Sequence, residues 1–263
     1  MGLWPPCGRL GSIAAGAKPT AHQYREMPGG TAVGAERSAG AGQEEGKRTH
    51  MSQFRFCAKL DQTILLGKRA GTLPELLEGI RTVPKSSIYY HTHRFLQAHH
   101  YLTPEPSNDF AYWCTEVLND VLLGEQLSSI DIVGFNNIAD LQARLAEIVA
   151  GQIRGRQRTS EAPPGEEFHF MASRLFVMQT QHVATTLAEF REMLKLVSTD
   201  SLYYHIFDAK LRLGNGENDF SSWFRDLGNP ALADEVTHLD PYTYTLEGLR
   251  KRLIVLVTKH GKT

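Results

Sequence analysis

The sequence lacks most of the features that assign a chain to a functional class. It has three cysteines in 263 residues, Cys7, Cys57 and Cys114, which are too few and too widely spaced for a zinc site or a disulfide framework. Its formal net charge is −1, which gives no electrostatic reason to expect nucleic-acid binding. No apolar run approaches the ~18 residues that a membrane span needs. We therefore expect a globular protein of the reducing cytoplasm, without nucleic-acid or membrane partners.

Sequence motifs for common catalytic chemistry are also missing. The chain has no P-loop, no glycine-rich dinucleotide motif, no nucleophile elbow and no His-Glu-x-x-His zinc motif. Ten of its 23 glycines lie in the first fifty residues, away from any patterned helix or strand. The sequence consequently names no cofactor and predicts no metal site.

Residues 1–50 differ from the rest of the chain. They are rich in Gly, Ala, Pro and charged residues and have almost no apolar periodicity. Such a segment buries too little apolar surface to offset the entropy lost on ordering. We expect it to be disordered and to precede the natural start of the protein, at Met51.

The patterned part of the chain contains an internal repeat. The copies share three short patterns at matching places: a Thr-Leu-x-Glu segment (70–75 and 184–189), a Ser-x-Tyr-Tyr-His segment (87–91 and 201–205) and an Asn-Asp-Phe-x-x-Trp segment (108–113 and 218–223). The first two patterns keep one constant offset, that of His91 to His205. Residues present in both copies answer a common structural demand, whereas residues found in one copy are free for another role.

Each copy begins with apolar residues at every second position, which predicts a short extended strand. The Thr-x-x-Glu pattern that follows is typical of a helix start, and Pro84 should end the first helix. Further helices are expected over 86–100, from 107 or 108, over 118–130 and over 138–153, and in the second copy over 200–213, 231–239 and 246–257.

The predicted fold is mainly α, with two tandem helical repeats of about 100 residues related by a pseudo-two-fold axis. The predicted units are 51–153, a polar linker at 154–166, 167–258 and a tail at 259–263. Because one repeat alone is small for a stable core, we expect the two to share a core.

The shared motifs allow two interpretations. Tyr90 and His91, with their neighbours, could converge on a ligand pocket, or they could pack with their polar atoms bonded to the backbone or to a nearby Asp. The Asn-Asp-Phe-x-x-Trp motif is typical of a helix cap followed by core aromatics, with Asp109 in the first turn.

The residues that only the first copy has are the stronger functional candidates. They are His93, Arg94, His99 and His100, clustered just after His91. No two of these histidines have the i, i+3 or i, i+4 spacing that presents two ligands to one metal ion from a helix. An anion or sugar-phosphate site and a solvated helix face remain open for this cluster.

Four phrases give the chain a family resemblance: Ser87-Ile-Tyr-Tyr-His-Thr-His-Arg-Phe95, Asn108-Asp-Phe-Ala-Tyr-Trp113, Glu167-Phe-His-Phe-Met171 and 239–249. They resemble a bacterial family of uncharacterised proteins, one of the domains of unknown function, over about residues 54–257. The resemblance implies kinship and supplies no activity or catalytic residues.

Together these observations predict a cytoplasmic helical binding or accessory protein that engages a small polar ligand or a protein partner through the first repeat. The ligand-binding candidates are Tyr90, His91, His93, Arg94, His99, His100 and Asp109. The alternative is an enzyme on a small polar or phosphorylated substrate, in which a His oriented by Asp109 acts as general acid and base. A structural interaction module is a third possibility.

Overall fold

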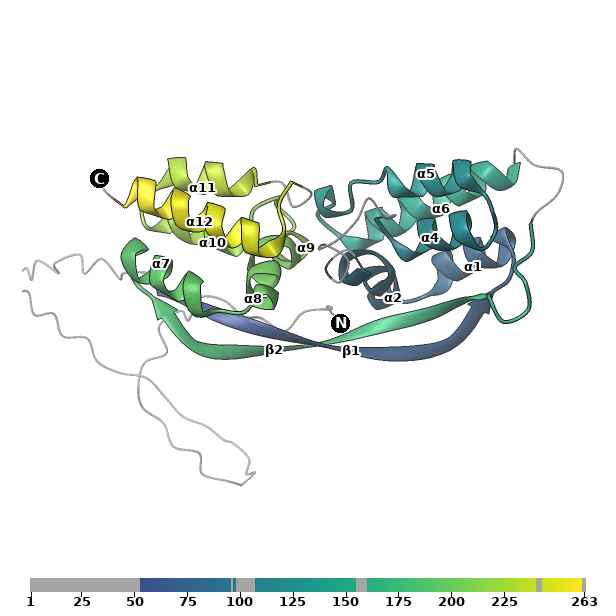
Figure 1. The fold of residues 1–263 in the computed structure, drawn as a ribbon, viewed down its shortest axis with the longest axis horizontal. Coiled ribbons are helices and arrows are strands. Elements are labelled where there is room, and N and C mark those ends of the chain that lie inside the picture. Colours follow the sequence, from purple (N-terminus) through teal and green to yellow (C-terminus); the bar gives the residue numbers. More distant parts are fainter. Residues whose placement is uncertain (1–52, 96, 98–106, 155–159, 240–242, 262–263) are drawn as a thin grey trace, which may run out of the picture.

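Two sets of helices lie side by side on one long β-ribbon (Figure 1). The computed structural model describes residues 53–95, 97, 107–154, 160–239 and 243–261, so the predicted N-terminal region 1–50 lies outside the described residues. The strands β1 (Phe54–Ala70) and β2 (Phe168–Ala184) pair antiparallel. Each strand precedes one set of helices, which confirms the predicted, mainly helical fold of two tandem repeats.

The two repeats contain corresponding elements. The first repeat has α1 (Leu73–Thr82), α2 (Lys85–Tyr89), η1 (Tyr90–Arg94), α4 (Asp109–Glu116), α5 (Val121–Ser128), η2 (Ile132–Gly134) and α6 (Ile138–Arg154). The second has α7 (Leu187–Leu196), α8 (Thr199–Tyr203), η3 (Tyr204–Asp208), α9 (Ala209–Leu213), α10 (Asp219–Asp226), α11 (Pro230–Thr237) and α12 (Leu246–His260).

Helix starts follow the predicted capping residues. The Thr72 hydroxyl accepts a hydrogen bond from the Glu75 N–H at 3.4 Å at the start of α1, and Thr186 caps α7 in the same way. Asn108 caps α4 and Asn218 caps α10. These predictions are confirmed because a cap depends on residues within one turn.

The helix predicted over 118–130 is shorter than expected. The helix α5 begins only at Val121, because Asp120 accepts a hydrogen bond from the Leu123 N–H and Asn119 adopts a φ of 54°. A residue with positive φ cannot continue a helix, so the apolar Leu118 belongs to the preceding turn.

The helix predicted over 200–213 is present as one unbroken helical run, α8, η3 and α9, and the described part of the helix predicted over 86–100 begins with α2 and η1, but neither is a regular α-helix throughout. A π-helical turn, η1 or η3, follows α2 and α8. A π turn bonds each N–H to the carbonyl five residues earlier and so inserts one residue into the helix. Apolar spacing over five residues cannot distinguish this insertion from a regular α-helix.

The strands are much longer than the short strands expected, at 17 residues each. In their central parts apolar side chains such as Leu60 and Phe176 are exposed while Lys59 is buried, so apolar residues no longer occupy the buried positions of the strands. The register is itself symmetric. Asp61 pairs with Leu175, its own counterpart in the second repeat. The two register shifts lie at equivalent places on either side of that pair. The pseudo-two-fold axis therefore passes through the middle of the ribbon.

The ribbon supplies each repeat with part of its core. Phe54 and Phe56, at the start of β1, lie among the core residues of the second repeat. Phe168 and Phe170, at the start of β2, lie among those of the first repeat. The expectation of one shared core was wrong, since there are two main clusters. Each is completed by aromatic side chains from the strand that begins beneath it.

Candidate functional site

The histidine of each Tyr-Tyr-His motif forms the same two hydrogen bonds. His91 Nδ1 lies 2.6 Å from Asp109 Oδ2, and His91 Nε2 accepts the Met171 backbone N–H at 2.9 Å. In the second repeat, His205 lies 2.7 Å from Asp219 and accepts the Cys57 N–H at 2.8 Å. Each carboxylate thus accepts a hydrogen bond from the Nδ1–H, and the Nε2 lone pair accepts one from the strand N–H.

These bonds hold each helix to the ribbon beside a register shift. Cys57 and Met171 both stand where the β1–β2 pairing is interrupted. There the histidine supplies an acceptor for a strand N–H. His91 is buried and both of its nitrogens are occupied, so in this conformation it has no nitrogen to exchange a proton with a substrate.

A buried polar cluster lies where the two repeats meet. Lys59 Nζ donates to Asp208 Oδ2 at 2.6 Å and to the Tyr89 hydroxyl at 2.7 Å, and that hydroxyl donates to Asp208 Oδ1 at 3.0 Å. The ammonium also lies 4.6 Å from the centre of the Tyr203 ring. The Lys59 and Asp208 side chains are 2% and 0% exposed. Lys59 comes from β1, Tyr89 from the first repeat and Asp208 from the second, so the cluster joins all three.

Burial sets the electrostatics of this cluster. It raises the pKa of Asp208, while the charge of Lys59 beside it acts in the opposite direction. Burial, together with the adjacent Asp208 carboxylate, also raises the pKa of Tyr89, which keeps that hydroxyl protonated as a donor. The cluster is asymmetric, because Ser173 and Arg94 stand at the positions that correspond to Lys59 and Asp208.

His93 packs against the same cluster, and its ring is parallel to that of Tyr89 with the centroids 5.5 Å apart. Burial, assisted by the charge of Lys59, lowers its pKa to about 3. Its backbone carbonyl accepts the Tyr203 hydroxyl at 2.9 Å, a direct bond between the repeats. His93 is therefore a neutral core residue in neutral solution.

We expect these histidines to make the protein sensitive to acid. Burial lowers the pKa of His93 and of His205 below the 6.5 of the unfolded chain. Well above pH 6.5 both histidines are neutral in the folded and in the unfolded chain, so their burial does not lower the free energy of unfolding. As the pH falls below that value, the unfolded state binds protons that the native state rejects. For His93 the unfolding free energy then falls by up to about 1.4 kcal/mol per pH unit, and His205 changes it in the same direction.

The variant His93→Phe isolates one of these contributions, since Phe207 stands at the corresponding position of the second repeat. Urea unfolding at several pH values between 6.5 and about 4 should give a shallower pH dependence for the variant than for the wild type. Parallel curves for the two proteins would contradict the expectation.

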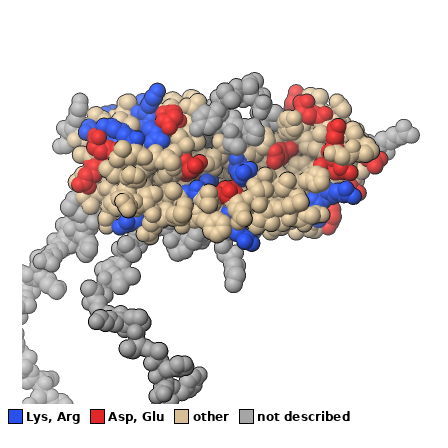
Figure 2. All heavy atoms as spheres, turned by 60° about the horizontal axis from the view of Figure 1, so that its bottom comes forward, with Lys and Arg blue, Asp and Glu red and all other residues tan. Residues whose placement is uncertain are grey.

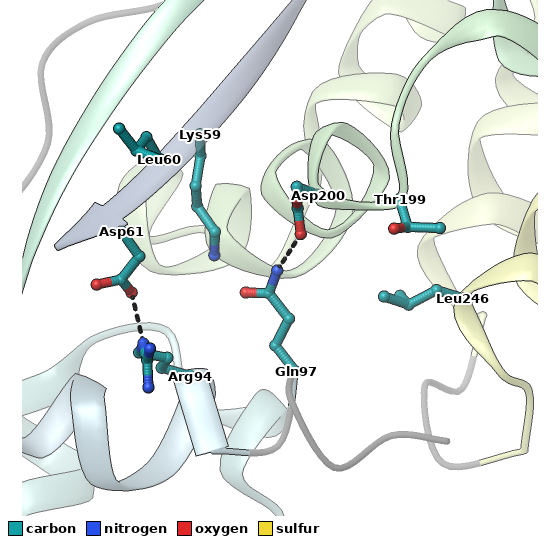
Figure 3. A pocket seen from close by; sticks show the side chains of 8 residues that line it. All are labelled: Lys59, Leu60, Asp61, Arg94, Gln97, Thr199, Asp200 and Leu246. Atoms are coloured by element: carbon teal, nitrogen blue, oxygen red, sulfur yellow. Dashed lines mark hydrogen bonds and ion pairs between the residues drawn. The ribbon is translucent and has the colours of Figure 1, made fainter. Parts of the chain in front are cut away.

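A cavity of ≈ 280 Å³ opens beside the buried cluster, between the repeats (Figure 3). Its lining comes from β1, the end of the π-helical segment η1, the residue Gln97 beyond it, and the starts of α8 and α12. The lining residues are Lys59, Leu60, Asp61, Arg94, Gln97, Thr199, Asp200 and Leu246. Gln97 Nε2 donates to Asp200 Oδ1 at 2.7 Å and so bridges the two repeats. Arg94 Nε lies 3.4 Å from Asp61 Oδ2.

Arg94 is the predicted site residue that the structure places in the cavity wall. Its guanidinium packs over the ring of Tyr90, 4.7 Å from the ring centre. His91, His93 and Asp109 are engaged in the contacts described above and do not line the cavity. His99 and His100 lie outside the described residues.

Sequence reasoning missed Lys59, Asp61 and Asp200 at this place. Period-two spacing gave no signal for Lys59 and Asp61, because both are out of phase with Phe54 and Phe56, and the change of phase comes from the register shift between Arg55 and Cys57. Nothing in the local pattern of Asp200 distinguishes it from a first-turn helix residue.

Among the described residues, no group of three or more His, Cys, Asp or Glu side chains could hold a metal ion. In that same part of the chain, no helix is both long and apolar enough to cross a membrane. Figure 2 shows basic and acidic side chains interspersed on the face in view, with no continuous basic patch among the atoms described.

Comparison with known proteins places the chain in a family. The sequence pattern of the family of unknown function DUF5752 matches residues 51–258. The chain belongs to this family. The solved structure of OrfY from Thermoproteus tenax is similar to it at 30% sequence identity, with a TM-score of 0.68. The similarity covers 81% of this chain and 97% of OrfY. No curated protein matches the chain.

These matches confirm the resemblance to a domain of unknown function over nearly the whole patterned region. OrfY comes from an archaeon, so the restriction to bacteria stays a prediction.

Proposed function

We propose that this protein is a binding protein, acting in the cytoplasm, whose small polar ligand occupies the cavity between the two repeats. The observation that carries the proposal is the composition of the cavity wall. Five of its side chains carry a charge or an amide, and they come from β1 and from both repeats. Ligand pockets commonly lie at such junctions, where a few polar groups converge on a hollow with apolar walls.

The asymmetry of the wall supports the same proposal. Arg94 and Asp61 correspond to Asp208 and Leu175 in the other repeat, so the fold of the repeat does not itself require them. In the cavity wall the two side chains lie within ion-pair distance and point toward each other (Figure 3). A function that needs Asp61 and Arg94 in one copy only explains why the two copies differ at these positions.

A screen of small metabolites by thermal shift tests this proposal. The wild type is compared with Arg94→Gln, and Arg225→Gln on α10 is the matched control, since the two arginine side chains are 35% and 39% exposed and both form ion pairs. A ligand at 100 times its dissociation constant stabilises the native state by about 2.7 kcal/mol, and each kcal/mol raises the Tm by about 2–4 °C at this size.

We expect at least one compound to raise the Tm of the wild type and of Arg225→Gln, and to do so much less for Arg94→Gln. The proposal fails if no compound in the screen shifts the Tm, or if every shift is the same in all three proteins.

A further inference from the structure

We infer that the ligand of the cavity is a small, neutral, polyhydroxylated compound. This inference rests on the proposed function and adds to it the chemical class of the ligand. The first argument is the charge of the wall. The wall carries two cations, Lys59 and Arg94, and two carboxylates, Asp61 and Asp200, so it presents charges of both signs to a ligand.

The second argument is that these charges already have partners. Lys59 is held by Asp208 at 2.6 Å, with both side chains buried, and Arg94 lies against Asp61. The Asp200 carboxylate accepts from Gln97. An anionic ligand would have to draw Lys59 or Arg94 from its carboxylate, and separating the buried Lys59–Asp208 pair would leave a charge without compensation. A cationic ligand would meet the Asp200 carboxylate, but it would lie beside the Arg94 guanidinium and could not accept hydrogen bonds from the Arg94 and Thr199 donors. Either kind of ion therefore binds at a disadvantage.

The third argument concerns hydrogen bonds that the wall can still form. Of the bonds between described residues, Gln97 uses its amide nitrogen and Asp200 uses one carboxylate oxygen, which leaves the Gln97 Oε1 and the Asp200 Oδ2 as acceptors. The terminal nitrogens of Arg94 and the Thr199 hydroxyl add donors. A hydroxyl group donates and accepts at one atom, so neighbouring hydroxyls match such a mixed set.

The shape of the cavity fits the same class. Leu60 and Leu246 provide apolar walls that can face the C–H groups of a polyol, while the polar atoms engage its hydroxyls. The volume of ≈ 280 Å³ lies just below the range of about 300–1,000 Å³ for pockets that hold drug-sized ligands, which restricts the ligand to a small molecule.

The test uses probes that differ in charge but not in carbon number: erythritol, putrescine and succinate, with inorganic phosphate and the larger polyol sorbitol alongside. Binding is read by NMR titration of the isotope-labelled full chain, because polyols stabilise proteins generally through exclusion from their surface, and a thermal shift would not separate the two effects. We expect erythritol or sorbitol to give saturable shifts at Thr199, Asp200 and Leu246.

The variant Asp200→Ala should weaken polyol binding by about tenfold, the scale of one hydrogen bond to a charged group. The matched control is Asp234→Ala on α11, an exposed aspartate that pairs with Arg225 outside the cavity, and it should bind like the wild type. Unchanged polyol binding in Asp200→Ala would overturn the inference.

The inference and the proposed function fail in different ways. If putrescine, succinate or phosphate titrates the cavity residues while both polyols leave them unmoved, the ligand class is wrong and the binding function stands. If neither the probes nor any compound of the thermal-shift screen binds, both are wrong.

Discussion

Replacement of Lys59 by methionine is expected to lower the free energy of unfolding by about 3–5 kcal/mol, because it leaves the Asp208 carboxylate buried without its cation. The methionine occupies similar space, so the loss of packing is small. The Tyr89 hydroxyl alone then donates to Asp208, at 3.0 Å in the present structure. Urea unfolding followed by circular dichroism measures the change.

The double variant Lys59→Met/Asp208→Leu separates the loss of a partner from the loss of the pair. It removes both charges, and apolar replacement of a buried pair is often neutral or stabilising, so most of the lost stability should return. Lys195→Met is the matched surface control, since Lys195 pairs with Glu192 at 2.7 Å with half of its side chain exposed. Its effect should be negligible. A Lys59→Met variant no less stable than Lys195→Met would contradict the role given to the buried cluster.

The variant Phe170→Ala is expected to lower the free energy of unfolding by about 3–5 kcal/mol, the usual range for truncating a buried phenylalanine. Phe170 belongs to β2 but is fully buried in the core of the first repeat. Thermal and urea unfolding of the variant should therefore report the loss of stability in helices that precede it by many residues in the sequence.

Gly79 of α1 supplies the internal control for this prediction. A Cβ at Gly79 would overlap the Cζ of Phe170, so Gly79→Ala alone should destabilise the protein by about 1–3 kcal/mol through overpacking. In the Phe170→Ala background the added methyl enters the vacated space, and the penalty should vanish or reverse. Simple additivity of the two substitutions would show that the contact between α1 and β2 is not formed as described.

The parts of this structure that the sequence predicted are those governed by neighbouring residues. Thr72, Thr186 and Asn108 cap helices because a cap needs only a side-chain oxygen and an N–H within the next turn. The last long helices begin at the predicted residues, Ile138 and Leu246, for a similar reason: their apolar spacing is regular over several turns.

The π turns and the length of the ribbon could not be predicted in this way. The π turn at Tyr90–Arg94 carries His91, whose partners on β2 and α4 lie far along the chain and leave no trace in the local sequence pattern. The central ribbon residues are exposed on one side and contact the polar cluster on the other, so their pattern resembles neither a buried strand nor an amphipathic one.

The candidate site was predicted only in part for the same physical reason. Arg94 drew attention because the second repeat has Asp208 in its place, and it does line the cavity. The histidines beside it drew attention through their chemistry, yet burial makes His93 a neutral packing residue. Asp200 and Lys59 meet this surface only after the ribbon and both repeats are assembled, and no local pattern in the sequence records that meeting.

The exchange of aromatic residues through the ribbon has a consequence for synthesis of the chain. The helices of the first repeat are complete at Arg154, but their core still lacks Phe168 and Phe170, which leave the ribosome later. The second repeat in turn uses Phe54 and Phe56, which were made before any of its own helices. Neither repeat can therefore finish folding during translation before β2 has emerged, and the N-terminal strand must wait for its final partners until the last helix is made.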